Sequence, residues 1–193
     1  MRRTLTLAAL AAALVVFPAT AGDAASAGGE DYHVIVTVPP GWHIDTDRKP
    51  VPRVLALSPR MKDFEKGSAH PMKRAPDQIV CGFSRAKKKD PIDQPQAQIN
   101  AAVRQNFEDL KTQTANQRRQ DTLLLTLIED QGLVGVAVVL VGTDAENYGY
   151  LYASSTFDTP LYQYKGDCIG ELSEGSVLKA DIVTLIGSLR PVP

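Results

Sequence analysis

The residue types best suited to metal chemistry are a histidine and two aspartates that alternate along one short segment, His43, Asp45 and Asp47. Residues two apart on an extended strand point to the same face, so the imidazole and both carboxylates would face one way. A further ligand such as His33 or Asp31 would complete a divalent-cation site. The alternative, which we favour, is a solvated polar face beside a turn, so the sequence predicts no cofactor.

Five tyrosines are the strongest candidates for an interaction surface. Three of them alternate within one predicted strand, over 148–157, and would share a face. Exposed tyrosines suit recognition because the ring supplies contact area and the hydroxyl supplies hydrogen bonds. Buried tyrosines would instead pack beneath a helix, and both interpretations stay open. The set is Tyr148, Tyr150, Tyr152, Tyr162 and Tyr164.

A basic run at the end of another predicted strand is the second interface candidate. It consists of Arg85, Lys87, Lys88 and Lys89. These side chains would dock an acidic partner or an anionic membrane surface. The alternative is a solvated loop whose charges keep an edge strand from aggregating.

Motifs of known catalytic mechanisms are absent from the sequence. There is no Gly-x-Ser-x-Gly elbow, His-Glu-x-x-His pair, phosphate-binding Gly-Lys loop or dinucleotide fingerprint. The chain has 3 histidines, which leaves few candidate general bases. The sequence therefore predicts a protein that is not an enzyme, with no catalytic residues to name.

The N-terminus has the plan of a secretory signal peptide. Arg2 and Arg3 precede an apolar run over 5–17, and Ala19-Thr20-Ala21 follows as a cleavage site. We therefore expect a signal peptide over 1–21, a flexible leader over 22–30 and one domain over 31–193. Such a domain of about 170 residues can bury a sizeable core. The predicted location is the periplasm or the extracellular space, with no transmembrane span.

Two cysteines, Cys81 and Cys168, are the only ones in the chain. In an exported protein an even pair favours a disulfide, and two buried thiols are the alternative. Loop-entropy models assign about 4–5 kcal/mol to closing so long a loop. The whole chain carries 21 basic and 22 acidic residues, which argues against nucleic acid as a partner.

The hydrophobic periodicity predicts an α+β fold, a mostly antiparallel sheet flanked by two main helices in an α/β/α-like sandwich. Asp93 is the expected N-cap of the first helix. The hairpin strands are apolar enough to be central, and Cys168 falls in a glycine-rich loop. Strands are expected at 32–38, 42–44, 53–58, 78–85, 120–130, 133–142, 148–157 and 161–164, with helices ending near 114 and 189.

Two segments carry a family resemblance. Val36-x-Val38-Pro-Pro-Gly-Trp42 enters a strand, and Ile182-Val-x-x-Ile-x-Ser-Leu-Arg-Pro191 closes a helix. With the central helix and the valine-rich hairpin, they resemble the PsbP/DcrB-like superfamily over most of 32–191. The resemblance implies a sheet between helices and a non-enzymatic accessory, assembly or binding role. The polar insert over 59–76 and the cysteine pair depart from that pattern.

Together these observations predict an exported, monomeric or weakly associating, non-enzymatic accessory or binding protein of the bacterial envelope. It would contact an envelope protein through the tyrosine-bearing sheet or the 59–76 loop, as an inhibitor, immunity protein or assembly factor. The alternatives are a small-ligand or divalent-metal-binding module and, less favoured, a hydrolase with an unrecognised site.

Overall fold

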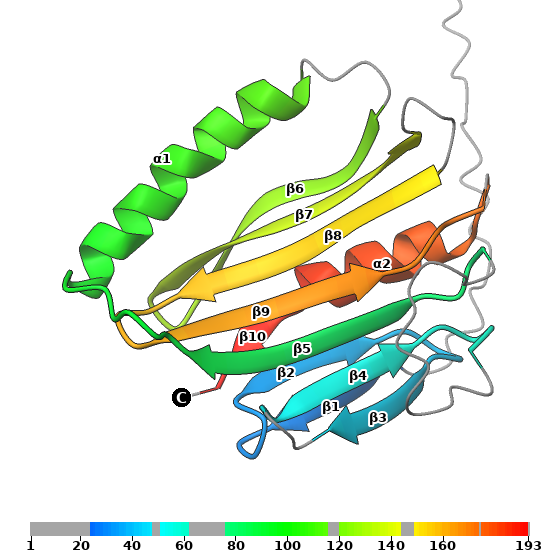
Figure 1. Ribbon diagram of the computed structural model, residues 1–193, viewed down its shortest axis with the longest axis horizontal. Coiled ribbons are helices and arrows are strands. Elements are labelled where there is room, and N and C mark those ends of the chain that lie inside the picture. The colour runs from blue at the N-terminus through cyan, green and yellow to red at the C-terminus, as the bar shows by residue number, and fades with distance from the viewer. Residues whose placement is uncertain are drawn as a thin grey trace, which may run out of the picture.

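The computed structural model describes residues 24–47, 51–61, 76–115, 120–143, 149–173 and 175–192. These residues form two antiparallel sheets and two helices (Figure 1). The expected signal peptide over 1–21 and most of the polar insert lie outside the described residues.

Seven strands form the large sheet, in the order β3-β4-β5-β9-β8-β7-β6. It consists of two meanders, β3 to β5 and β6 to β9, placed side by side. All of the pairings are antiparallel. The strands are β3 (His43–Asp47), β4 (Arg53–Leu57), β5 (Val80–Lys87), β6 (Gln120–Asp130), β7 (Leu133–Thr143), β8 (Gly149–Asp158) and β9 (Tyr162–Ile169).

A small sheet has the order β1-β2-β10, with β1 (Ala25–Gly29), β2 (Val34–Val38) and β10 (Arg190–Pro191). The strand expected at 32–38 is present as β2, and its side chains alternate, because Val34, Val36 and Val38 are buried while Ile35 is 39% exposed.

The stretch 22–30, expected as a flexible leader, instead contains β1. Its small residues pair with β2 through backbone hydrogen bonds, which need no large side chains. Gly28 has a φ of +109°, and a Cβ there would overlap the Val34 carbonyl oxygen. Close approach of two backbones therefore explains this glycine better than a flexible linker does.

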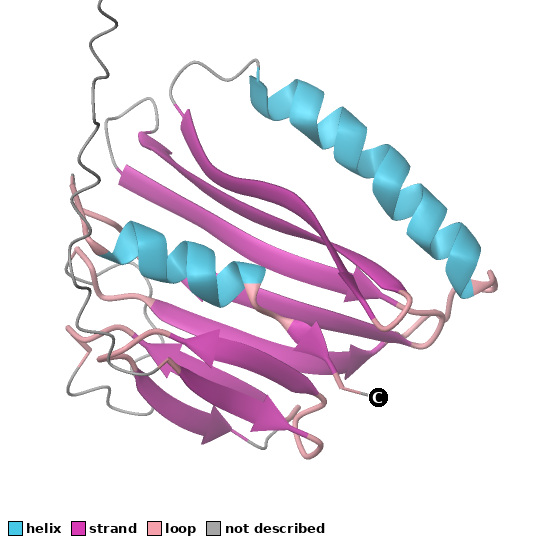
Figure 2. Ribbon diagram, turned by 180° about the vertical axis from the view of Figure 1, so that it is seen from behind, coloured by secondary structure: helices cyan, strands magenta, loops and turns pink. Residues whose placement is uncertain are grey.

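The two helices lie on opposite faces of the large sheet (Figures 1 and 2). Helix α1 (Gln96–Ala115) packs on β6 and β7, while α2 (Leu178–Gly187) packs on the other face beside β2. Apolar residues spaced three or four apart form a stripe along α2 and just after it, and all four are buried: Leu178, Ile182, Leu185 and Leu189. This arrangement confirms the α+β class and the helix-flanked sheet.

The face beneath α2 and the small sheet, here called the inner face, holds the main core. Phe83 of β5, Val139 of β7 and Phe157 of β8 are all 0% exposed there. Trp42, 7% exposed, donates its Nε1–H to Asp181 of α2 over 2.9 Å. The single tryptophan is therefore a core anchor that fixes α2 to the sheet.

One strand position differs from the prediction. The hairpin strand β6 was expected to be central, but it is an edge strand of the large sheet. Its leucine-rich sequence reflects burial from two sides, because α1 and α2 both contact β6 from opposite faces. The apolar pattern of a strand therefore indicates that both of its faces are covered, and does not indicate whether the strand is central or at the edge of the sheet.

Cys168, expected in a glycine-rich loop, lies within β9 in the middle of the sheet. Gly166, two residues before Cys168, also lies within β9, and a Cβ at this position would lie 2.5 Å from Phe83 Cδ1. The glycine makes room for a core phenylalanine in the adjacent strand, so glycine content misled the prediction here.

Candidate functional site

One face of the large sheet is only partly covered. Among the described elements, α1 lies over β6 and β7 on this face, and none lies over β8, β9, β5, β4 and β3 (Figure 1). We call the uncovered area the open face. Antiparallel sheets often leave one face to solvent, and such faces normally carry polar side chains. The open face departs from that pattern at one end, where large apolar side chains are exposed.

A groove runs between α1 and β8, with a volume of about 240 Å³. Its floor and helix wall are mostly apolar, and its outer rim is formed by side chains of β8. Alternation along β8 places these rim residues on the open face while Ala153, Ser155 and Phe157 point inward. The lining residues are Val103, Asn106, Phe107, Leu110, Val136, Val138, Tyr152, Ser154, Thr156 and Asp158.

Tyr152 stands where this groove meets an apolar strip. Its side chain is 55% exposed, and so is Ile169 of β9. Because Ala153 pairs with Cys168, Tyr152 and Ile169 are the next residues along the two neighbouring strands. Leu140 of β7 pairs with Tyr152, and Val80 of β5 pairs with Ile169. The strip therefore crosses four strands from β7 to β5.

Beyond the strip, two charged side chains of β9 on the open face pair with each other. Lys165 Nζ lies 2.9 Å from Asp167 Oδ1 on the same strand. Ser154 donates its hydroxyl to Asp167 Oδ1 over 3.4 Å. The two charged side chains are 48% and 41% exposed, so the pair adds little stability. It leaves this part of the face close to neutral.

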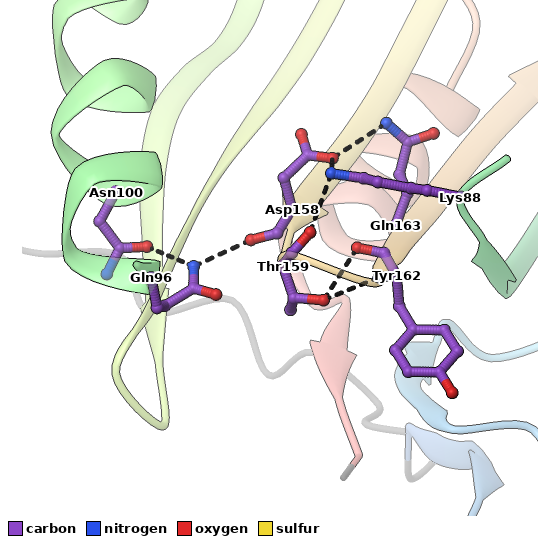
Figure 3. Close-up of polar contacts among 7 residues, drawn as sticks. All are labelled: Lys88, Gln96, Asn100, Asp158, Thr159, Tyr162 and Gln163. Carbon is purple, nitrogen blue, oxygen red and sulfur yellow. Dashed lines mark hydrogen bonds and ion pairs between the residues drawn. The ribbon is translucent and has the colours of Figure 1, made fainter. Parts of the chain in front are cut away.

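A polar cluster fixes one end of the groove (Figure 3). Lys88 Nζ lies 2.7 Å from Asp158 Oδ1 and donates to the Thr159 carbonyl over 2.9 Å. Gln163 Nε2 donates to the same Asp158 carboxylate over 3.3 Å. The Gln96 amide donates to the Asp158 carbonyl over 2.9 Å. These bonds tie the β8–β9 turn to the start of α1.

The same cluster continues to the β6–β7 turn. Gln96 Nε2 also donates to Asn100 Oδ1 over 2.8 Å, and Asn100 Nδ2 donates to the Gly132 carbonyl over 2.8 Å. The Val134 N–H donates to Asn100 Oδ1 over 3.2 Å. Helix α1 begins at Gln96, so the expected N-cap at Asp93 lies two residues too early. Side-chain bonds to two strand turns orient the helix instead.

The structure does not gather the five candidate tyrosines on one surface. Tyr152 lies on the open face, whereas Tyr162 and Tyr164 of β9 lie on the inner face, where Tyr164 is 5% exposed. Tyr148 and the side chain of Tyr150 lie outside the described residues. Tyr152 is thus the described tyrosine placed for contact with another molecule.

The basic run is also divided. Lys88 is held in the polar cluster with only 13% of its side chain exposed. The Arg85 guanidinium lies 4.3 Å from the centroid of the Tyr162 ring, a cation–π contact. Lys87 and Lys89 are exposed. Two of the four cations therefore have partners within the fold.

The alternating trio lies in β3, with His43 and Asp45 on the open face. Asp45 Oδ1 accepts the Thr46 backbone N–H over 2.8 Å, and the Asp47 side chain lies outside the described residues. Within the described part of the chain, no group of three His, Cys, Asp or Glu side chains is placed to hold a metal ion. His33 lies in the turn between β1 and β2.

The predicted disulfide is confirmed. Cys81 of β5 and Cys168 of β9 are directly paired across the two strands, with an S–S bond of 2.04 Å. The side chains are 0% and 6% exposed, so the bond lies within the core.

The sequence analysis did not identify one buried aspartate. Asp77, 6% exposed with φ of +67°, accepts the Ser173 hydroxyl over 2.6 Å and the Ser173 N–H over 3.0 Å. Burial raises the pKa of the Asp77 carboxyl, but hydrogen bonds from Ser173 and Ser176 and the Arg60 charge together hold that pKa below its ordinary value. The partners come from distant segments, so no local pattern signals them.

The rim of the groove was also missed, although a signal was present. Ser154 and Thr156 alternate with the buried residues of β8, which is typical of a strand with one polar face. The apolar wall of the groove comes from a stripe of α1 residues spaced three or four apart, of which Phe107 is buried and Val103 and Leu110 are half-buried. What the sequence did not reveal is that this stripe extends past β7 to the flank of β8.

No family model and no curated protein matches the chain. Among solved structures, the chain is similar to cyanobacterial PsbP from Synechocystis sp. PCC 6803, with a TM-score of 0.45 and 10% identity over 92% of this chain and 98% of that one. It is also similar to the Ran-binding protein Mog1p of Saccharomyces cerevisiae, with a TM-score of 0.43 and 10% identity over 88% and 97%. At 10% identity, these likenesses concern the fold alone. Neither described helix is long and apolar enough to cross a membrane.

Proposed function

We propose that this chain is an exported, non-enzymatic accessory protein of the bacterial envelope that binds a partner protein through the open face. The observation that carries the proposal is the Tyr152 side chain, 55% exposed where the groove meets the apolar strip. A large aromatic beside an apolar depression is the usual centre of a protein interface.

The chemistry of the face indicates what kind of partner surface fits. The groove floor, formed by Val136 and Val138, accepts an apolar side chain. The hydroxyls of Ser154 and Thr156 on the rim offer hydrogen bonds to a polypeptide backbone. Lys165 and Asp167 already pair with each other, so we expect an affinity that depends weakly on salt. A polypeptide segment with one apolar side therefore matches this surface.

Two further observations support the proposal. The Cys81–Cys168 disulfide is compatible with an exported protein. Among the described groove residues Asp158 is the one carboxylate, and its pairing with Lys88 makes it a poor general base. The groove thus has the composition of a binding surface rather than of a hydrolytic centre.

The test is affinity capture from envelope extract of the producing organism, using the mature chain, Tyr152→Ala and Val177→Ala. Val177 is 86% exposed and precedes α2, so it controls for loss of an exposed apolar side chain elsewhere. The partner is then purified and its affinity measured by calorimetry. We expect Tyr152→Ala to weaken binding about 30-fold, with Val177→Ala unchanged.

Equal binding by all three proteins would place the interface elsewhere and refute the role of the open face. Absence of any stoichiometric partner would refute the binding function. Thermal unfolding of each variant checks that the domain is intact, because Tyr152 is too exposed for its truncation to unfold the domain.

A further inference from the structure

The pairing of β5 with β9 is the seam of the large sheet. Every other pairing among its described strands joins elements that follow one another in the chain. The seam instead joins the β3–β5 meander to the β6–β9 meander, and Cys81 and Cys168 are separated by 87 residues. Forming it carries the largest loop-closure entropy of any pair in the sheet.

Three sets of contacts hold the seam together, one at each end and one between them. At one end, the Asp77 N–H donates to the Glu171 carbonyl over 2.8 Å, beside the Asp77–Ser173 bonds. At the other end, the Lys88 N–H donates to the Leu161 carbonyl over 2.9 Å, beside the Lys88–Asp158 pair. Between these ends lies the disulfide. It is the covalent fastening of the seam, and the one whose presence depends on the redox conditions.

We propose that the Cys81–Cys168 disulfide is a redox-dependent lock on the seam, closed after export. In a reducing compartment the seam opens readily while each meander keeps its hairpin pairings. Oxidation closes the seam and completes the open face, because that face extends across β8, β9 and β5. The link to partner binding rests on the function proposed above, whereas the opening of the seam does not.

The chemistry of the lock is thiol–disulfide exchange with an oxidised dithiol or glutathione disulfide. One cysteine thiolate attacks the donor disulfide, forms a mixed disulfide and releases one donor thiol. The second cysteine thiolate then attacks the mixed disulfide and releases the other donor thiol. The chain loses two electrons and two protons, and the donor disulfide gains them. The closed bond is buried, so re-reduction requires the seam to open first.

Hydrogen exchange of the mature chain, with no partner present, tests the lock. The oxidised protein, the same protein reduced by dithiothreitol, and the Cys81→Ala/Cys168→Ala variant are compared. We expect the amides of β5 and β9 to exchange at least about 10-fold faster in both the reduced protein and the double variant, with β7 amides changing much less.

A uniform increase across the whole sheet would overturn the lock, since the disulfide would then stabilise the domain globally. Unchanged exchange in β5 and β9 would overturn it as well. The functional arm measures the affinity of the reduced protein for the partner identified by capture. Equal affinity in both redox states would overturn the link between the lock and the open face. Because exchange is measured without a partner, failure of the proposed function leaves the test of the seam intact.

Discussion

Replacing Lys88 by methionine should destabilise the domain without touching an exposed basic patch. The substitution keeps most of the aliphatic stem and removes the ammonium group, which lies 2.7 Å from Asp158 Oδ1 and 2.9 Å from the Thr159 carbonyl oxygen. Methionine has nearly the volume of lysine, so packing around the stem should persist. The variant therefore isolates the charge and its two contacts.

The magnitude follows from the burial of the pair. The two side chains are 13% and 27% exposed, which lies between a surface pair and a buried one. Surface pairs contribute less than about 1 kcal/mol, whereas breaking a buried pair costs about 3–5 kcal/mol. We expect a loss of about 2 kcal/mol in the free energy of unfolding. For a domain of this size, the loss corresponds to a fall of about 5 °C in melting temperature.

Urea unfolding of Lys88→Met, Asp158→Asn and the double variant measures the coupling between the two side chains. Lys89→Met is the matched control, because Lys89 is the exposed neighbour and carries the same charge. A coupling below about 0.5 kcal/mol would refute the argument that the cluster is a structural clamp. Lys88→Met that leaves stability unchanged but abolishes partner binding would restore the docking role predicted from the sequence.

Two further substitutions test the packing and the electrostatics of the seam. Gly166→Ala should lower the free energy of unfolding, measured with urea, by about 3 kcal/mol, because its Cβ would lie 2.5 Å from Phe83 Cδ1. Gly82→Ala is the control: its Cβ would lie 3.5 Å from Leu55 Cδ2, so it should change the free energy of unfolding by less than about 1 kcal/mol. Equal effects of the two substitutions would contradict the packing argument. Asp77→Asn should lower stability by about 2 kcal/mol at pH 7, and because the folded pKa of Asp77 lies below its unfolded value, this deficit should shrink as the pH falls below about 4. A deficit that does not change with pH would refute the charge-based account.

The local elements of the fold were predictable from the sequence because their cause is local. The stripe of α2 repeats every three or four residues, and all four of its members are buried. The hairpin of β6 and β7 follows from two apolar strands joined at Gly132. The disulfide followed from an even number of cysteines in a chain with a predicted export signal, without any knowledge of the pairing of β5 with β9.

The arrangement of these elements was not predictable in the same way. The order of the two meanders and the incorporation of β1 depend on contacts between distant segments. Asp77 illustrates the difficulty, because its partner Ser173 lies 96 residues away. The candidate site was the hardest part to predict, because the exposure of Tyr152 depends on how far α1 extends across the sheet. Tyr164 has the same residue type and a similar alternating context, yet it is buried.

The division of the sheet into two meanders has a consequence for limited proteolysis. The connection between β5 and α1 includes exposed residues at 89–91 and 93–95, where a protease has access to the backbone. A cut there separates the strands β1 to β5 from α1 and all that follows. Each fragment keeps one cysteine of the disulfide, so the nicked protein stays a single covalent particle. Cleavage at this connection would therefore convert this chain into a two-chain protein without releasing either half.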